Sequence, residues 1–242
     1  MIGYMIFAQI WEMKKRHGAC YPHAFQPVSR YVPSKFFLTT MTSHHSPRDD
    51  RMRQLLAQEA ARLMETEGIQ DYYAAKYKAA ERLGAADTRN LPRNTEVEQA
   101  RSEFLRLFQA DTAPVRLRIL REAALQAMKL LACFQPRLVG AALSGAVGLY
   151  SDIELHLFSA TPEEVNLFLE EHRIPYEQEE RKVRVGRDKY RNFPVYGFRA
   201  GDWTVTLTVF HLDGLRQAPL SPVDGRPERR ANAAAVYDLL NN

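Results

Sequence analysis

Two acidic residues that lie two positions apart, Asp152 and Glu154, are the side chains in this sequence best suited to chemistry. The surrounding pattern predicts a strand over residues 152–158, and residues i and i+2 of a strand point to the same face. The two carboxylates would then lie side by side, with Ile153 turned toward the core. Adjacent carboxylates repel each other unless a cation lies between them, and hard oxygen ligands suit Mg²⁺. The pair therefore predicts metal-assisted phosphoryl or nucleotidyl transfer.

A segment of small residues and glycines precedes this acidic pair. Residues 138–143 are predicted to form a strand that ends in small side chains, and a turn containing several glycines follows it. Because glycine has no Cβ, such a turn lets the backbone approach a phosphate closely. To hold a metal-bound triphosphate, a protein needs an acidic pair beside a turn of this kind.

The stretch from Val139 to Phe158 resembles the signature of the nucleotidyltransferase superfamily, the DNA polymerase beta-like fold. In this alignment Gly140 falls on the motif glycine and Gly145 on the internal glycine. The run Ser151-Asp152-Ile153-Glu154 falls on the Ser-Asp-x-Asp/Glu element. The resemblance covers residues 115–212. From about residue 49 the chain also resembles a group of bacterial proteins labelled nucleotidyltransferase-like, a label that names no substrate.

The resemblance implies an activity, a cofactor and a set of site residues. Asp152 and Glu154 would be catalytic and would hold Mg²⁺, while Gly140, Ala141, Gly145 and Ser151 would bind the nucleotide. The expected reaction moves a nucleoside monophosphate from an NTP to an acceptor, which could be a small molecule, a protein or RNA.

The sequence departs from the family pattern at two positions. Ala141 replaces the motif serine that meets a nucleotide phosphate, although backbone N–H groups could still bind one. Thr206 occupies the expected place of the third acid on a later strand. Asp202, Asp213 and Asp224 are the other acids in that part of the chain, and Asp202 is about 13 Å away along the strand. Without a third carboxylate, a non-catalytic nucleotide-binding or protein-interaction module with a degenerate fold is the alternative to an active transferase.

A crowded basic segment follows the acidic pair. It contains Arg181, Lys182, Arg184, Arg187, Lys189 and Arg191. Because cations suit phosphate, this segment could meet a triphosphate or a nucleic-acid backbone, and Arg184 and Arg187 are our candidates for contacts with the triphosphate. The alternative is a solvated hairpin balanced by Glu177, Glu179 and Glu180. His156 shares the face of Glu154 and could be a ligand or an acid–base group, although packed strand histidines are more common.

The first half of the chain predicts helices, in residues 49–68, 71–83, 95–109 and 114–134, because good helix formers recur there at helical spacing. Residues 60–73 resemble the opening helix of TetR-type repressors. The recognition helix expected next is absent, so we do not expect DNA binding, and a nucleic-acid-binding regulator is the third hypothesis. The fold expected is α+β, a helical module at 49–112 followed by a nucleotidyltransferase-like mixed sheet with flanking helices at 113–242.

Composition limits the remaining possibilities. The 242 residues are 45% hydrophobic and 26% charged, as in soluble globular proteins, and two cysteines without a metal-binding spacing argue against a zinc site. No apolar run is long enough to span a membrane, so we expect a cytoplasmic protein. Residues 1–48 hold six of the 33 basic residues and one acid, and lack a regular period. We expect them to be a flexible extension or an over-called start.

Overall fold

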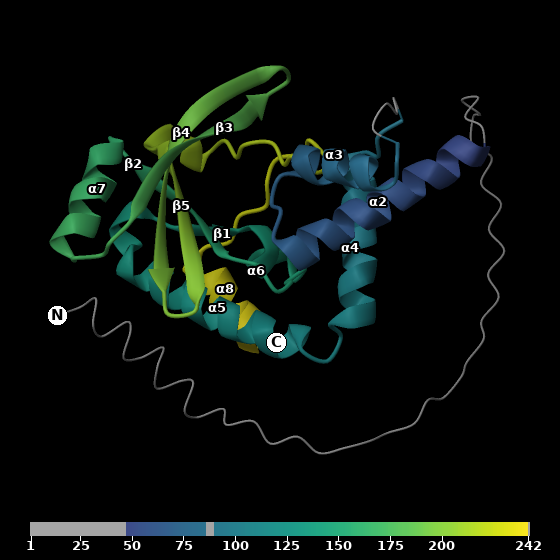
Figure 1. Cartoon of the computed structure of the whole chain (residues 1–242). Helices are drawn as coiled ribbons and strands as arrows, with labels where there is room; N and C mark the ends of the chain where they lie inside the picture. Colours follow the sequence, from purple (N-terminus) through teal and green to yellow (C-terminus); the bar gives the residue numbers. More distant parts are fainter. Residues whose placement is uncertain (1–46, 86–89, 242) are drawn as a thin grey trace, which may run out of the picture.

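The computed structural model describes residues 47–85 and 90–241, so the expectation for residues 1–48 falls almost wholly outside it. The helices are α2 (Pro47–Glu67), α3 (Tyr72–Arg82), α4 (Asn94–Phe108), α5 (Ala113–Leu130), α6 (Gly140–Ser144), α7 (Pro162–Glu171) and α8 (Ala233–Asn241), with two 3₁₀ turns, η1 (Ala132–Phe134) and η2 (Leu212–Leu215). The strands are β1 (Arg137–Val139), β2 (Ile153–Ser159), β3 (Glu177–Gly186), β4 (Lys189–Ala200) and β5 (Trp203–His211). The α+β class, with helices preceding a mixed sheet, is confirmed (Figure 1).

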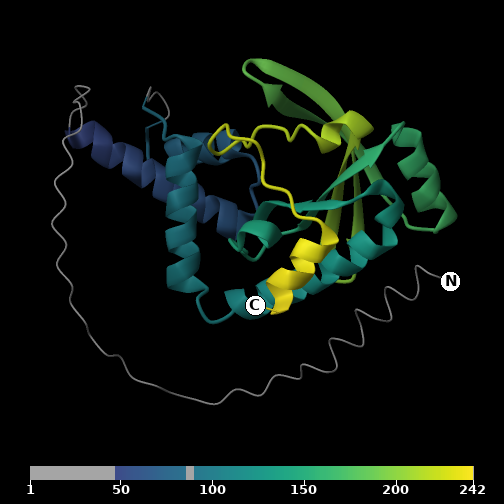
Figure 2. The same ribbon diagram turned by 180° about the vertical axis from the view of Figure 1, so that it is seen from behind.

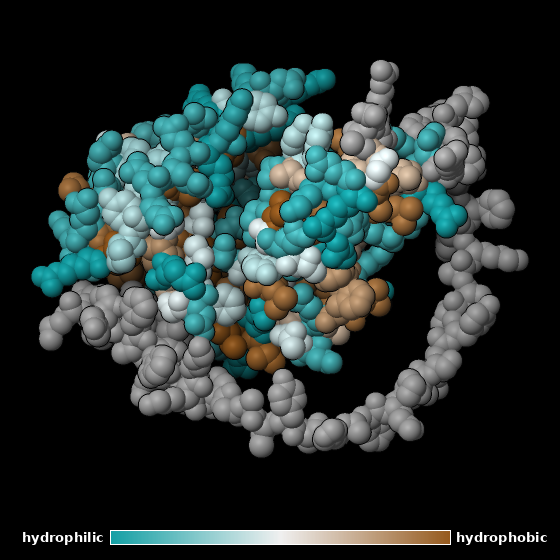
Figure 3. Space-filling view, in the orientation of Figure 1, coloured by the Kyte–Doolittle hydropathy of each residue, from teal (hydrophilic) through white to brown (hydrophobic). Residues whose placement is uncertain are grey.

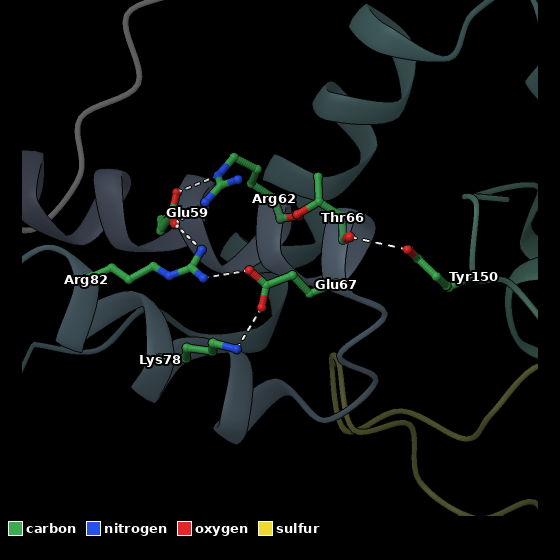
Figure 4. Close-up of polar contacts among 7 residues, drawn as sticks. All are labelled: Glu59, Arg62, Thr66, Glu67, Lys78, Arg82 and Tyr150. Atoms are coloured by element: carbon green, nitrogen blue, oxygen red, sulfur yellow. Dashed lines mark hydrogen bonds and ion pairs between the residues drawn. The ribbon is translucent and has the colours of Figure 1, made fainter.

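The helical module, α2 to α4, has its own hydrophobic core. Small and aliphatic side chains at helical spacing, such as Leu56, Ala60 and Leu63, are fully buried there. Gly68 ends α2 with a φ of +70°, a conformation that glycine adopts without strain. On the surface, Arg82 of α3 binds Glu59 and Glu67 of α2 (Figure 4). These exposed ion pairs add little stability, so burial of the apolar faces is the main force that holds the helices together.

The second half of the chain is a five-stranded sheet in the order β1-β2-β5-β4-β3. The pair β2–β5 is parallel and the other three pairs are antiparallel. One face packs on α5, α7 and α8 through a second hydrophobic cluster that includes Leu155, Leu207 and Tyr196. In Figures 1 and 2, α5 and α8 lie against the same side of the sheet. The opposite face carries the acidic pair.

The two hydrophobic clusters separate between α4 and α5, near residue 112. None of the helices in residues 47–85 and 90–241 is both long and apolar enough to cross a lipid bilayer.

Two elements differ from the expectation. Residues 138–143 are not one strand, because Gly140, with a φ of +67°, ends β1 and begins the short helix α6. The sequence pattern predicts strands over residues 181–185 and 194–199 in this region. The observed β3 and β4 are longer, and they form a hairpin whose polar residues obscure the period-two signal. Its turn includes Asp188, which tolerates a positive φ of 57°.

Candidate active site around the acidic pair

The carboxylates of Asp152 and Glu154 lie on the sheet face opposite the core. Asp152 directly precedes β2, and Glu154 pairs in register with Thr206 of β5. The neighbouring Ile153 is fully buried on the other face. The expected arrangement of the pair on one face is therefore what the structure has, and Thr206 occupies the place beside Glu154.

Gly140 makes room for the Glu154 carboxylate. A Cβ at position 140 would lie 2.4 Å from Oε1 of Glu154, well inside van der Waals contact. The positive φ of Gly140 adds a second reason for glycine at this position. Gly140 and the Glu154 carboxylate thus lie close together, because β1 and β2 pair side by side with Val139 in register with Glu154.

The other residues of the expected phosphate turn shape the connection from α6 to β2. Ala141 is half-buried within α6, and Gly145 ends that helix with a φ of +90°. Ser151 is buried, and its Oγ accepts a hydrogen bond of 2.9 Å from the N–H of Gly148. Its hydroxyl therefore closes the turn that leads into Asp152.

Burial disfavours the charged forms of both the Asp152 and the Glu154 carboxylate. Burial raises the pKa of Asp152, against the lowering effects of the Thr204 hydroxyl and the Arg199 charge. Burial also raises the pKa of Glu154, and the charge of Asp152 adds to this. The charges of Arg181 and Arg101 act on Glu154 in the opposite direction. A cation held between the two carboxylates would relieve this cost.

The donors present fit a magnesium ion that arrives with phosphate. Magnesium in proteins is commonly bound by one or two carboxylates together with substrate phosphates, and this pair supplies two hard oxygen donors. Within residues 47–85 and 90–241 there is no group of three or more His, Cys, Asp or Glu that could hold a metal ion. Asp152 and Glu154 would therefore supply two of the ligands of such an ion.

The three acids considered as a possible third carboxylate, Asp202, Asp213 and Asp224, lie in surroundings different from those of the acidic pair. Asp202 lies in the turn between β4 and β5. The Asp213 carboxylate lies 3.1 Å from Nδ1 of His211, and Asp224 accepts a hydrogen bond from the N–H of Arg226. In the part of the chain that the structure describes, none of them joins the pair in a group able to hold a metal.

A different acid lies near Glu154, and sequence reasoning missed it. Glu228, in the loop before α8, has its pKa raised to about 7, first by burial and then by the charge of Glu154. Its Oε2 lies 3.6 Å from Nε2 of His156. Glu228 reaches the sheet because Leu138 of β1 and Ala231 exchange backbone hydrogen bonds in an isolated bridge. No local sequence period predicts such a bridge.

Arg230 fixes the orientation of the His156 ring. Its Nε donates to Nδ1 of His156 at 3.0 Å, so a neutral His156 carries its proton on Nε2 and directs it toward Glu228. The guanidinium lies about 5 Å from the ring centroids of both Phe158 and Phe210. It also donates to the carbonyl of Gly214. Burial lowers the pKa of Arg230 to about 10. The pKa of His156 is lowered to about 3, first by burial and then by the charge of Arg230.

The helical module contacts the turn before Asp152, and a buried ion pair lies at this contact. Glu65 of α2 is 2% exposed, and its Oε1 accepts a hydrogen bond of 2.5 Å from Nε of Arg101 on α4. The other oxygen of Glu65 lies against Gly148, where a Cβ would be only 1.8 Å away. On the same loop, the Tyr150 hydroxyl donates to the carbonyl of Thr66 (Figure 4). The module therefore holds the turn that precedes Asp152, and the Arg101 charge reaches Glu154.

The two arginines expected at the triphosphate are not brought to the carboxylates. In register, Glu154 is aligned through β5 and β4 with Glu177 of β3. Arg184 lies seven residues farther along β3, about 23 Å at 3.3 Å per residue, and Arg187 is in the exposed turn beyond it. The arginine of this strand whose charge does act on Glu154 and Glu228 is Arg181.

The buried neutral His156 predicts a specific pH dependence of stability. Its pKa is about 3 in the folded protein against an ordinary 6.5, so between these values the unfolded chain binds more protons. The contribution of neutral His156 is therefore complete above pH 6.5 and is lost as the pH falls toward 3, at up to about 1.4 kcal/mol per pH unit. Urea unfolding of wild type and His156→Gln at several pH values tests this.

The informative quantity is the difference in free energy of unfolding, wild type minus variant. Glu228, whose pKa is raised, contributes in the opposite direction in both proteins, which is why the difference is used. We expect this difference to decrease steadily as the pH falls below 6.5. Parallel pH profiles for the two proteins would show that His156 is not held neutral.

Neither of two grooves on the helical module, of about 360 and about 400 Å³, is lined by Asp152 or Glu154. The recess between the helical module and the sheet is visible in Figure 3.

No family model, no curated protein and no solved structure matches the chain. The candidate site therefore rests on its own geometry.

Proposed function

We propose that this protein binds an NTP through Mg²⁺ and transfers the nucleoside monophosphate to an acceptor, a small molecule, a protein or RNA. The observation that carries the proposal is the close approach of Gly140 to Glu154, which puts a glycine turn against one of two carboxylates that lie two residues apart in the chain. The resemblance of residues 139–158 to the nucleotidyltransferase signature supports the same activity. NTP and Mg²⁺ are abundant in the cytoplasm, where we propose that the protein acts.

Each residue of the site has a defined part in this proposal. Asp152 and Glu154 would hold the Mg²⁺, which would neutralise charge on the phosphates and on the leaving pyrophosphate. Gly140 keeps the Glu154 carboxylate close to the backbone, and Ser151 fixes the turn before Asp152. Glu228 is a carboxylate near Glu154 whose pKa of about 7 suits acceptance of a proton from an attacking hydroxyl.

Calorimetric titration with each NTP tests the binding step. Wild type should bind at least one NTP in the presence of Mg²⁺ and lose that binding when EDTA is added. Asp152→Asn and Glu154→Gln should each weaken binding at least tenfold, equivalent to about 1.4 kcal/mol. Asp213→Asn is the matched control, because it removes an exposed acid from another part of the fold and should bind as wild type does. Equal affinity in Asp152→Asn and Asp213→Asn would rule out the proposed site.

A second candidate is a nucleotide-binding protein without catalytic activity. It is favoured by the register of Thr206 with Glu154, because the third acid of the family pattern is expected there. Both candidates predict Mg²⁺-dependent binding, so pyrophosphate release separates them. Release from a bound NTP when cell extract supplies the acceptor supports the transferase, whereas binding without release supports the second candidate.

A further inference from the structure

Charge is divided along the hairpin formed by β3 and β4. The acids Glu177, Glu179 and Glu180 lie in the half of β3 that begins the strand, next to the rest of the sheet. The distal half, residues 181–191, contains six basic side chains and one acid, Asp188. Its net charge is therefore +5, from six positive charges and one negative. The distal half projects beyond the other strands (Figure 1).

The acids near the sheet do not neutralise the distal cations. Arg181 lies 3.4 Å from Glu179, and it is the one distal cation of the six with a carboxylate within ion-pair distance among the described residues. Glu180 instead accepts a hydrogen bond from Asn192. Lys182, Arg187, Lys189 and Arg191 are all exposed. The interpretation of this segment as a balanced, solvated hairpin therefore does not describe its distal half.

The strand register assigns these side chains to the two faces of the hairpin. Arg184 is directly opposite Tyr190, and Val183 is opposite Arg191. Since opposite residues of an antiparallel pair share a face, Lys182, Arg184 and Tyr190 lie together on one face. The Lys182 ammonium lies 5.2 Å from the centre of the Tyr190 ring, and Tyr190 is 54% exposed. An exposed aromatic ring thus lies beside the Lys182 ammonium, on the hairpin face to which the register also assigns Arg184.

We propose that the distal half of this hairpin binds the backbone of single-stranded nucleic acid, with the phosphates on its cations and a base stacked on Tyr190. Cations that follow a chain of phosphates, combined with an exposed aromatic ring, are the usual means of binding single strands without sequence preference. From Lys182 to Arg187, in the turn directly after β3, the cations extend over about 16 Å, which suits a chain of phosphates better than a single triphosphate.

Nucleic acid is favoured over an anionic membrane by the composition of the hairpin surface. Peripheral membrane segments bury several apolar side chains among the lipids. Among residues 181–191, Tyr190 is the one large hydrophobic side chain that is exposed. This binding surface does not depend on the proposed nucleotide transfer, because it uses neither Asp152 nor Glu154.

Fluorescence anisotropy with labelled oligo(U) and oligo(dT) of about 20 nucleotides tests the inference. Wild type should bind both, and its affinity should fall with rising salt. The variant Lys182→Ala/Lys189→Ala/Arg191→Ala should bind at least tenfold more weakly, with a salt slope smaller by roughly 0.7 for each phosphate contact that is lost. Tyr190→Ala should weaken binding at least fivefold with little change in the salt slope.

The control removes the same charge from exposed positions on α4 and α5. Arg106→Ala/Arg118→Ala/Lys129→Ala should retain at least half of the wild-type affinity. Equal losses in the two triple variants, no binding of either oligonucleotide at low salt, or binding only to vesicles of phosphatidylserine would each overturn the inference. Thermal melts establish that each variant is folded. NTP titration of the hairpin variant separates the two proposals, because nucleotide binding should be unchanged there.

Discussion

Arg101→Met is expected to lower the free energy of unfolding by about 3–5 kcal/mol, the usual cost of removing one partner of a buried ion pair. The reason is the position of Glu65, which is 2% exposed and accepts a hydrogen bond from Arg101. The pKa of Arg101 is raised: burial alone would lower it, but the charge and hydrogen bond of Glu65, together with the charges of Glu98 and Tyr72, outweigh burial. Without Arg101, the Glu65 carboxylate must be buried alone. Urea unfolding followed by circular dichroism measures the loss.

Two further variants make this result specific to the pair. Arg106→Met removes an exposed arginine from the same helix, and it should change the free energy of unfolding by less than about 0.5 kcal/mol. Glu65→Met/Arg101→Met removes both charges, and it should recover most of the stability because no buried charge is left unpaired. A loss below about 1 kcal/mol in Arg101→Met would mean that water reaches Glu65 in solution.

Gly148→Ala is expected to destabilise the fold by about 1–3 kcal/mol, the usual cost of overpacking a closely packed site. The added methyl group would lie 1.8 Å from Oε2 of Glu65, so one of the two must move. The carboxylate cannot turn away freely, because its other oxygen is held by Arg101. The same displacement should disturb the turn that Ser151 closes, just before Asp152. The free energy of unfolding measures the first effect, and Mg²⁺-dependent NTP binding measures the second.

Gly197→Ala is the control for this substitution. Gly197 lies on β4, and a Cβ there would meet no atom within 4 Å. Its free energy of unfolding should stay within about 0.5 kcal/mol of wild type. If Gly148→Ala is as stable as Gly197→Ala, the close approach of Glu65 to the glycine turn is not maintained in solution.

Local sequence patterns predicted the features that depend on local spacing. The period of Leu56, Ala60 and Leu63 predicted a helix, and the alternation of residues 152–158 predicted a strand with both acids on one face. The region after Val139 was the exception, because a strand-like run of small residues also suits a helix once Gly140 turns the chain. The length of the β3–β4 hairpin was also missed, since its side chains are polar on both faces.

The sequence could not predict which distant residues surround the acidic pair. Glu228 and Arg230 arrive from a loop that is joined to β1 by one isolated bridge. Glu65 and Arg101 lie on two helices more than 50 residues before Asp152. Their positions depend on how the helical module packs against the loop before β2. That packing is a tertiary property with no periodic signal in the chain.

The most direct test of the proposed site is a crystal structure of the protein with a non-hydrolysable NTP analogue and Mn²⁺ in place of Mg²⁺. Anomalous scattering locates the Mn²⁺ without reference to the protein density. The proposal predicts Mn²⁺ in contact with the carboxylates of both Asp152 and Glu154 and with phosphate oxygens of the analogue. Nucleotide bound elsewhere, or Mn²⁺ that contacts neither carboxylate, would contradict it.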